Sequence, residues 1–169
     1  MKYSLDPIVG PESRVLILGT LPGARSLAAR AYYSHPRNQF RPLMHSIFGR
    51  DPGREPAERA AFIRRQRLAL WDVLRAAERE GSLDANIRNG IPNDLAPFLA
   101  AHPAIRAIAL NGGKAAQIFQ RQCWPALGAA LQARLSVHAL PSTSPAHAIG
   151  FERKLASWSI VRELAEREE

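Results

Sequence analysis

The segment 32–40, YYSHPRNQF, carries an unusual mixture of polar and aromatic side chains just after a glycine-containing turn. Tyr32 or Tyr33 could stack on a nucleobase, a contact that tolerates any base, and Arg37 could reach a phosphate. An amide such as Asn38 is no proton base at neutral pH, but its carbonyl oxygen can orient a water molecule. In the alternative interpretation, Asn38 caps the helix that follows it.

Two further segments place polar groups directly after apolar runs. Asn111 ends the run AIRAIAL and precedes two glycines. Its amide could read the edge of a heterocycle, because it carries both a donor and an acceptor, or it could cap the next helix. The segment 140–148, LPSTSPAHA, offers three hydroxyls of the kind that contact phosphate backbones. Ser144 followed by Pro145 is equally typical of a helix cap.

Strand and helix patterns alternate around these segments. Val15–Leu18 is a continuous apolar run, typical of a strand covered on both faces, and it leads into the turn 19–23. Similar strands are predicted in AIRAIAL and RLSVHAL, with a short element near Ala69–Trp71. The alternation predicts a parallel sheet with helices on both faces. Ligands bind such sheets at the carboxyl ends of the strands, so we expect the polar loops to meet at one edge.

Helices are predicted from apolar spacing in the remaining segments. The first is 38–49, which Gly49 would end, followed by a helix over much of 57–70. The segment DVLRAAEREG, 72–81, is predicted to be a helix ended by Gly81. A polar loop then leads to a helix capped near Asn93 or Asp94. Two more helices are expected over 114–124 and 151–169.

Composition suggests a nucleic-acid partner. The 169 residues are enough for one domain, expected to span 1–169. The net charge is +8, and with three lysines among 23 basic residues, 20 are arginines. Such a charge favours a polyanion, most often nucleic acid, although it could also be an arginine-rich solvated surface. No apolar run approaches the roughly 20 residues that span a membrane, and a cytoplasmic protein is expected.

Several chemistries lack their motifs. The single cysteine, Cys123, excludes an internal disulfide and is interpreted as a core residue. No metal-binding histidine motif, GxSxG elbow or Walker A loop is present, so neither a metal nor a cofactor is expected. Asp84 is the nearest carboxylate in a polar loop and stands alone, which suggests a bracing role. A non-catalytic nucleic-acid-binding module stays an alternative. A phosphate-handling α/β hydrolase is another, but it would need a metal cluster or an acidic pair near the turns.

Five segments in chain order resemble the uracil-DNA glycosylase superfamily, and within it the hypoxanthine-DNA (deoxyinosine) glycosylases. They are GTLPG, YYSHPRNQF, WDVLRAAEREGSLDANIRNGIPND, ALNGGKAA and LPSTSPAHA, between Val15 and Ala148. The resemblance implies a three-layer α/β/α sandwich around a four-stranded parallel sheet. It also implies an enzyme that flips a deaminated base out of DNA and excises it hydrolytically. The chain has three lysines and none lies in 32–40, which favours a monofunctional enzyme over one that forms a Schiff base. A monomer without a cofactor is expected. Hypoxanthine is the foremost substrate expected, with uracil or xanthine as others.

The resemblance implies roles for individual residues. Leu21 stands where other branches carry a catalytic Asp or Asn and cannot activate water, so the catalytic role falls to Asn38. Tyr33 matches the aromatic residue that stacks on the flipped base. The other expected base contacts are Gly19, Thr20, Leu21 and Asn111. The expected DNA contacts are Pro22, Gly23, His35, Arg37, Ser142, Thr143, Ser144, Pro145 and His147.

Two positions depart from the family's pattern. Arg41 and Pro42 follow the N-x-F triplet, where the family usually has Trp, and we expect a changed entrance to the pocket. His147 replaces the Asn of the usual SPANA segment, which predicts a changed wedge or an added phosphate contact.

Overall fold

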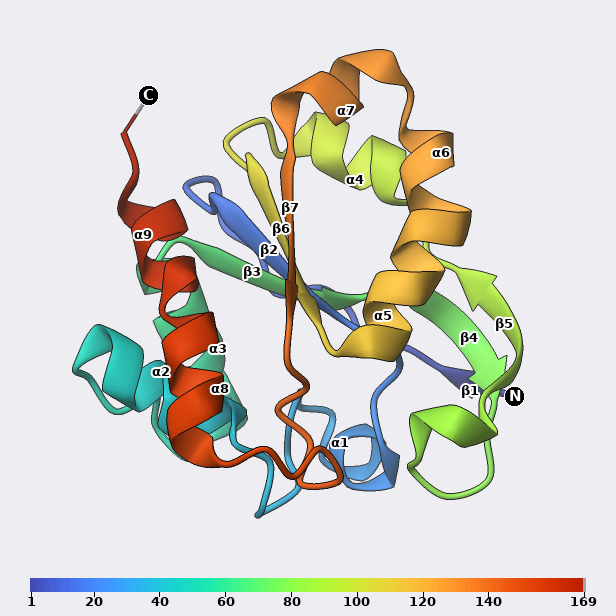
Figure 1. The fold of residues 1–169 in the computed structure, drawn as a ribbon, viewed down its shortest axis with the longest axis vertical. Coiled ribbons are helices and arrows are strands. Elements are labelled where there is room, and N and C mark those ends of the chain that lie inside the picture. Colours follow the sequence, from blue (N-terminus) through green and yellow to red (C-terminus); the bar gives the residue numbers. More distant parts are fainter. Residues whose placement is uncertain (169) are drawn as a thin grey trace.

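The computed structural model describes residues 1–168 and is built around a four-stranded parallel sheet (Figure 1). Its strand order is β3-β2-β6-β7. The strands are β2 (Val15–Gly19), β3 (Leu68–Asp72), β6 (Ala107–Asn111) and β7 (Ser136–Leu140). The predicted parallel sheet is confirmed, and the short element near Ala69–Trp71 is its edge strand β3.

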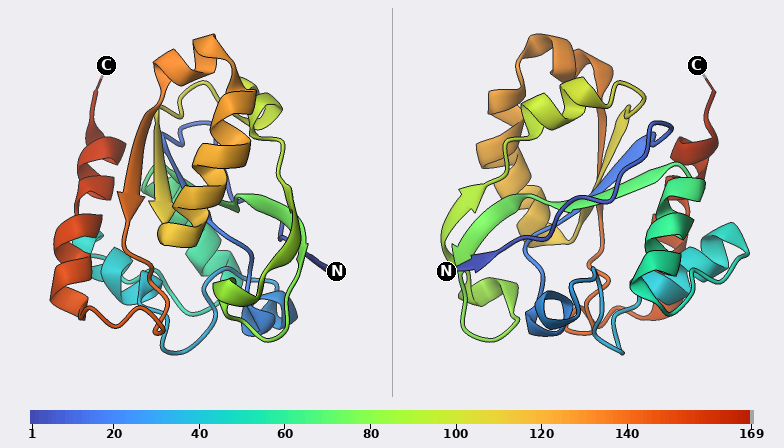
Figure 2. Two further views of the ribbon diagram at one scale, coloured as in Figure 1. Left: turned by 45° about the vertical axis from the view of Figure 1, so that its right-hand side comes forward. Right: turned by 180° about the vertical axis from the view of Figure 1, so that it is seen from behind.

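Helices cover both faces of this sheet, which confirms the three-layer arrangement (Figure 2). Leu16 and Leu18 point to one face and Val15 and Ile17 to the other, and all four are fully buried. The first face packs against α4 (Leu95–Ala101), α5 (Gly113–Ile118), the π-helix η2 (Phe119–Cys123), α6 (Trp124–Leu127) and α7 (Ala129–Arg134). The second packs against α2 (Phe40–Phe48), α3 (Pro56–Arg65), α8 (Phe151–Trp158) and α9 (Ile160–Glu166).

The helix expected over 38–49 is confirmed as α2. Its buried residues Phe40, Leu43, Met44 and Ile47 repeat every three or four positions and form one apolar stripe. Pro42 lies in the first turn, where a missing N–H costs no helical hydrogen bond. Gly49 ends the helix at a φ of 70°, a left-handed conformation that glycine adopts without strain. The helix expected near Asn93 or Asp94 is also confirmed, because α4 begins directly after Asp94.

The prediction of a helix over 72–81 is wrong. This segment forms β4 (Leu74–Glu78), which pairs with β5 (Arg88–Pro92) and β1 (Lys2–Tyr3) in a separate antiparallel sheet of order β1-β4-β5. The N–H groups of Val73 and Leu74 donate to the carbonyls of Gly19 and Thr20, at 2.8 and 3.2 Å. These bonds hold the chain extended beyond β3, so sheet pairing overrides a composition that favours a helix. The expected polar loop therefore contains β5 as well as the short 3₁₀ helix η1 (Asp84–Asn86).

The carboxy-terminal segment was predicted as one helix over 151–169. It forms two helices, α8 and α9, separated at Ser159, and residue 169 lies outside the described part of the chain. A short helix, α1 (Ala24–Ala29), follows the turn after β2. Within residues 1–168, no helix combines the length and the apolar character needed to cross a membrane.

Replacing Trp158 with Ala should lower the free energy of unfolding by about 3–5 kcal/mol. The Trp158 side chain is fully buried, and its ring lies edge-on to the Phe40 ring with 6.1 Å between the ring centres. Its Nε1 donates a hydrogen bond to the Pro141 carbonyl at 2.8 Å. Urea unfolding measures the change. As a control, Tyr3→Ala at a side chain that is 63% exposed should stay within about 0.5 kcal/mol of the wild type. Equal losses in the two variants would contradict this view of the core.

Candidate functional site

The carboxyl ends of three neighbouring strands bring Gly19, Asp72 and Asn111 together at one edge of the sheet. Gly19 lies level with Asp72 in the β2–β3 register. Leu18 pairs with Leu110, which places Asn111 at the level of Gly19 on its other side. Side chains alternate along a strand, so all three residues face the layer that contains α2. The expected meeting of polar loops at this edge is confirmed.

Asn111 is fastened to the loop that follows β7. Its Nδ2 donates to Thr143 Oγ1 at 3.1 Å, and its Oδ1 accepts from the Thr143 N–H at 3.0 Å. Both residues are buried, with exposed fractions of 7% and 1%. An amide has two N–H groups and two lone pairs, so one of each is not used by Thr143. The amide also lies close enough to the Tyr33 hydroxyl to lower the pKa of that hydroxyl. The amide thus both connects the strand end to the loop and keeps a donor and an acceptor.

Tyr33 lies over Gly19, whereas Tyr32 turns away from it. One face of the Tyr33 ring stacks on the Phe40 ring, with 4.4 Å between the ring centres, so a base could stack only on the other face. A Cβ atom on Gly19 would lie 3.2 Å from the Tyr33 hydroxyl and 2.9 Å from Asp72 Oδ1, so a larger residue here would force these side chains to shift. The Tyr32 hydroxyl donates instead to the carbonyls of Leu5 and Asp6. Of the two tyrosines, Tyr33 is therefore the one that belongs to the strand-end site.

Asn38 adopts the capping arrangement and still keeps an acceptor. Its Oδ1 accepts the N–H of Phe40 at 2.9 Å, at the start of α2. The second lone pair of this oxygen is available to a water molecule. The next residue, Gln39, donates its N–H to the Thr143 carbonyl at 2.9 Å. Thr143 therefore connects the segment around Asn38 to Asn111, because it bonds both to Gln39 and to Asn111, which lie far apart in the sequence.

The remaining predicted contact residues differ in exposure. Thr20, Leu21, Pro22 and Thr143 have buried side chains, and Gly23, His35, Ser142 and Ser144 are partly buried. Arg37, Pro145 and His147 are exposed. None of these exposures shows a contact with DNA, so the contacts of all these residues stay predictions.

The loop after β7 is held by hydrogen bonds between its own side chains and backbone. Ser142 Oγ accepts the Ser144 N–H at 3.1 Å, and Ser144 Oγ accepts the Ala146 N–H at 3.2 Å. The buried Lys154 ammonium donates to the Ser144 carbonyl at 3.1 Å. Burial lowers the pKa of Lys154. The loop therefore has a defined shape in the free protein.

Arg79 and Asp84 stabilise the turn after β2 through hydrogen bonds. The buried Arg79 guanidinium donates to the Leu21 carbonyl at 3.2 Å and to the Pro22 carbonyl, and lies 3.5 Å from Asp84. Asp84 Oδ2 accepts from Thr20 Oγ1 at 3.0 Å. Burial raises the pKa of Asp84, against the Thr20 hydrogen bond and the charge of Arg79. Asp84 has the bracing role expected from the sequence.

The expectation that Asp84 stands alone is wrong, because Asp72 is a second carboxyl near the same turn. Asp72 is 3% exposed, and burial raises its pKa to about 7, with Asp84 adding to the rise. Asp72 was missed because it opens the segment mistaken for a helix, although it follows a buried run as Asn111 does. An acidic pair therefore does lie near the turn. Within residues 1–168, however, no three His, Cys, Asp or Glu side chains gather to hold a metal ion.

A cavity of about 550 Å³ lies on the side of Tyr32 and Tyr33 toward α3 and the N-terminal segment. It is lined mainly by apolar side chains, with three arginines: Arg30, Arg41 and Arg59. Arg41 stands where the family usually has Trp, and it donates from Nε to the Gly53 carbonyl at 2.9 Å and pairs with Asp51. The departure at this position thus holds the loop after α2 beside the cavity.

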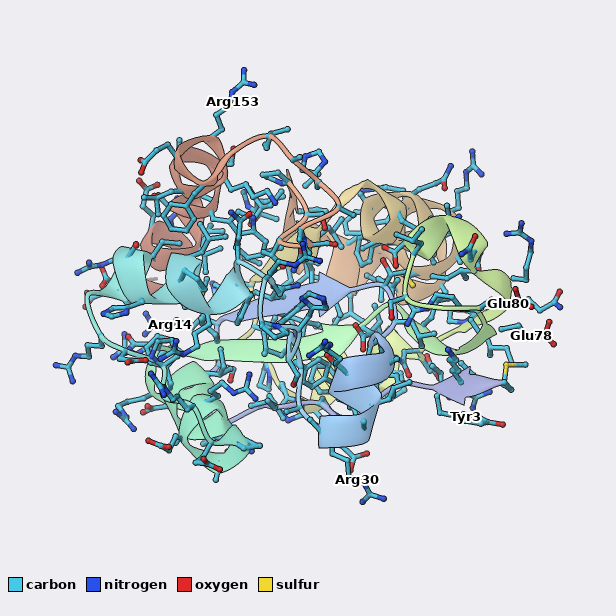
Figure 3. All side chains as sticks on the ribbon, turned by 90° about the horizontal axis from the view of Figure 1, so that it is seen from below. Tyr3, Arg14, Arg30, Glu78, Glu80 and Arg153 are labelled. Carbon is cyan, nitrogen blue, oxygen red and sulfur yellow. The ribbon has the colours of Figure 1, made fainter. Side chains whose placement is uncertain are left out.

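Basic side chains project from opposite sides of the end that holds the strand-end loops (Figure 3). Arg30, beyond α1, and Arg153, on α8, point outward on opposite sides. Glu78 and Glu80 lie together at the β4–β5 hairpin. A polyanion crossing this end would therefore meet cations on two sides and avoid the acidic hairpin.

Replacing Thr143 with Val should lower the free energy of unfolding by about 1–3 kcal/mol, because it leaves the buried Asn111 N–H without its acceptor. Valine keeps the shape of threonine, and urea unfolding measures the loss. Thr143→Ser restores the hydroxyl and should recover most of the stability. A serine variant as unstable as the valine variant would show that the methyl group, and not the hydrogen bond, carries the effect.

Comparison with known proteins shows the family. The sequence profile of the Uracil DNA glycosylase superfamily matches residues 7–165. A hypoxanthine DNA glycosylase of Methanosarcina barkeri is 32% identical over 117 residues, which cover 69% of this chain and 74% of the relative. A protein of the same name from Methanosarcina acetivorans is 31% identical over 118 residues, covering 69% and 75%.

The fold comparison agrees with the sequence comparison. A solution structure of a candidate uracil DNA glycosylase from Methanosarcina acetivorans matches with a TM-score of 0.81 and 27% identity. The match covers 98% of this chain and 99% of the other. The chain belongs to the uracil-DNA glycosylase superfamily, as the five sequence segments indicated.

Proposed function

We propose that this member of the superfamily excises hypoxanthine from DNA. The reaction class is that of a deaminated-base DNA N-glycosylase, and two relatives about 31–32% identical are named hypoxanthine DNA glycosylases. One observation carries the proposal: Thr143 ties the Asn38 segment to Asn111 at the strand ends, beside Tyr33. A polar site of this kind, next to an aromatic ring, suits an extruded base.

The reaction proceeds by hydrolysis at the sugar. As in glycoside hydrolysis, the C1′–N bond breaks through an oxocarbenium-like state. The electron pair of that bond leaves with the base, and the oxygen of a water molecule bonds to C1′. The water loses a proton to the solvent, and the anionic base takes one up from the solvent, so that one water molecule is consumed in total. The free lone pair of Asn38 Oδ1 orients this water. The products are the free base and an abasic site.

The other predicted residues surround the flipped nucleotide. Tyr33 stacks on the base with the face not covered by Phe40, and Asn111 reads an edge of the base with its remaining donor and acceptor. Backbone groups of the turn 19–23 contact the departing base. Arg37, His35, His147 and the loop 142–145 contact phosphates, which makes binding fall steeply with salt.

We propose that the enzyme is monofunctional and monomeric, and that the whole chain acts as one glycosylase domain. Lys154, the lysine nearest the loop after β7, is buried against the Ser144 carbonyl, where it is not poised to attack a sugar. The proposed place of action is the cytoplasm, on chromosomal DNA, because DNA is the substrate.

The activity is tested with labelled duplexes that carry deoxyinosine, deoxyuridine or deoxyxanthosine, followed by alkaline cleavage of abasic sites. We expect strand breaks at deoxyinosine above all. Binding to these duplexes with no abasic sites on any of them would favour the alternative of a non-catalytic nucleic-acid-binding module. The same duplexes in single-stranded form show which state the enzyme prefers.

Replacing Asn38 with Ala should lower the rate of deoxyinosine excision by at least about 10²-fold, because the attacking water loses its orienting group. DNA affinity should change little. Single-turnover kinetics and a binding titration separate the two quantities.

Asn38→Ser is the matched control for the capping role. Serine can still accept the Phe40 N–H, so the Asn38→Ser variant should keep most of the free energy of unfolding. The Asn38→Ala variant should lose about 1 kcal/mol of it. The serine oxygen does not reach as far as the amide oxygen, so excision should stay low. If the serine variant excised at the wild-type rate, Asn38 would have only a capping role and would not orient the water.

A further inference from the structure

The Asp72 carboxyl is buried at the site with one oxygen unused. Oδ2 accepts from Ser4 Oγ at 3.2 Å, and within residues 1–168 this is the one hydrogen bond that the carboxyl makes. Arg79, the nearest candidate cation, is committed to Asp84 and to the carbonyls of the turn. A buried carboxylate without a contacting cation is costly, so this environment favours the neutral carboxylic acid.

The Tyr33 hydroxyl is a second buried polar group, and it lies beside Asp72. Within the described residues no group meets it with hydrogen-bond geometry, although the nearby Asn111 amide lowers its pKa. A Cβ atom built on Gly19 would be 2.9 Å from Asp72 Oδ1 and 3.2 Å from Tyr33 Oη, so both oxygens reach the same point. Buried polar groups are rarely left unsatisfied, so a buried hydroxyl without a hydrogen-bond partner among residues 1–168, next to a carboxyl oxygen that makes no hydrogen bond there, points to a ligand at the strand ends.

The position of Asp72 relates it to the base. Asp72 flanks Gly19 on one side and Asn111 flanks it on the other, with all three facing the same layer. A base that stacks on Tyr33 and reaches Asn111 lies over the same strand ends as Asp72. The Ser4 hydroxyl, which fixes Oδ2, leaves Oδ1 as the atom on the Gly19 side.

We propose that Asp72, as a neutral carboxylic acid, donates a hydrogen bond to the carbonyl oxygen of the departing base. The inference rests on the proposed glycosylase function and assigns this function a further catalytic residue. As the C1′–N bond breaks, negative charge moves onto the base. In a deaminated base this charge reaches the carbonyl oxygen, where a fixed donor in a buried site stabilises it. A buried aspartic acid that stays neutral at pH 7 is a known kind of donor to such an oxygen.

The donor explains a preference for oxo bases. Hypoxanthine, uracil and xanthine all carry a carbonyl oxygen that gains charge as the bond breaks, whereas adenine has an amino group there. No proton needs to be transferred in this step, since the hydrogen stays on Asp72. If Asp72 were ionised, its charge would repel the departing anion.

The pH dependence follows from this role. Burial raises the pKa of Asp72 to about 7. The groups around it are Asp84, which raises the pKa further, Arg79 and the Ser4 hydroxyl, which lower it, and the hydroxyls of Tyr32 and Tyr33. The active form is the neutral one, so excision should be full below this pKa and decline as the pH rises through it.

Two substitutions at Asp72 test the donor directly by single-turnover excision of deoxyinosine between pH 5.5 and 9. Asp72→Leu removes the donor and should slow excision by about 10²–10³-fold at pH 6. Asp72→Asn keeps a neutral N–H donor of the same shape at every pH. It should stay within about tenfold of the wild type at pH 6 and lose the alkaline decline. Urea unfolding of both variants separates loss of activity from loss of fold.

Two neighbours should move the alkaline decline in opposite directions. Ser4→Ala removes a hydrogen bond that lowers the pKa of Asp72, so the decline should move to higher pH. Asp84→Asn removes a charge that raises this pKa, so the decline should move to lower pH. A purely structural Asp72 would give neither shift.

The outcomes distinguish this inference from the proposed function. An active wild type whose Asp72→Asn variant keeps the alkaline decline, or is as slow as Asp72→Leu, would overturn the role of Asp72 and leave the glycosylase activity standing. A wild type that releases no base from any of the three duplexes would overturn both.

Discussion

The site depends on the absence of a side chain at Gly19. Parallel pairing sets Asp72 and Asn111 level with this residue on its two sides, and the pleat turns all three toward α2. Any Cβ at Gly19 would meet Asp72 Oδ1 at 2.9 Å and the Tyr33 hydroxyl at 3.2 Å. The gap leaves room for the hydroxyl end of Tyr33 over Gly19, while the Tyr33 ring stacks on Phe40 and lies tilted against Tyr32. One missing atom thus allows an aromatic ring, a carboxyl and an amide to share a small buried space.

Buried polar groups hold the surrounding loops in place. Thr143 satisfies Asn111 with two hydrogen bonds and accepts one from Gln39, so a strand end, a helix start and a loop share one residue. On the other side, Arg79 satisfies carbonyls of the turn after β2, which would otherwise be buried without partners. The antiparallel β4–β5 hairpin supplies this arginine and carries Asp84 at its tip. The second sheet therefore serves the site by supporting its turn.

Two amides at the site make structural hydrogen bonds and keep further hydrogen-bonding positions open. Asn38 caps α2 and keeps a lone pair, and Asn111 joins two loops and keeps a donor and an acceptor. An amide can do this because it has more hydrogen-bonding positions than one partner uses. The fixed partners also orient the groups that remain, which is the preorganisation that catalysis requires. The capping and the chemical interpretations of these residues are compatible for this reason.

Local patterns were enough to predict the parallel sheet, the helix α2 and the convergence of three loops, because apolar runs such as Val15–Leu18 and stripes such as Phe40 to Ile47 reflect burial directly. The five ordered segments also indicated the family. That 74–78 is a strand follows from long-range pairing, since hydrogen bonds to Gly19 and Thr20 hold the chain extended although its composition favours a helix. The fold also places Asp72 beside Gly19 and turns Tyr33, and not Tyr32, toward it. Those facts depend on strand register and on close approach between distant segments, and no local pattern in the sequence encodes either.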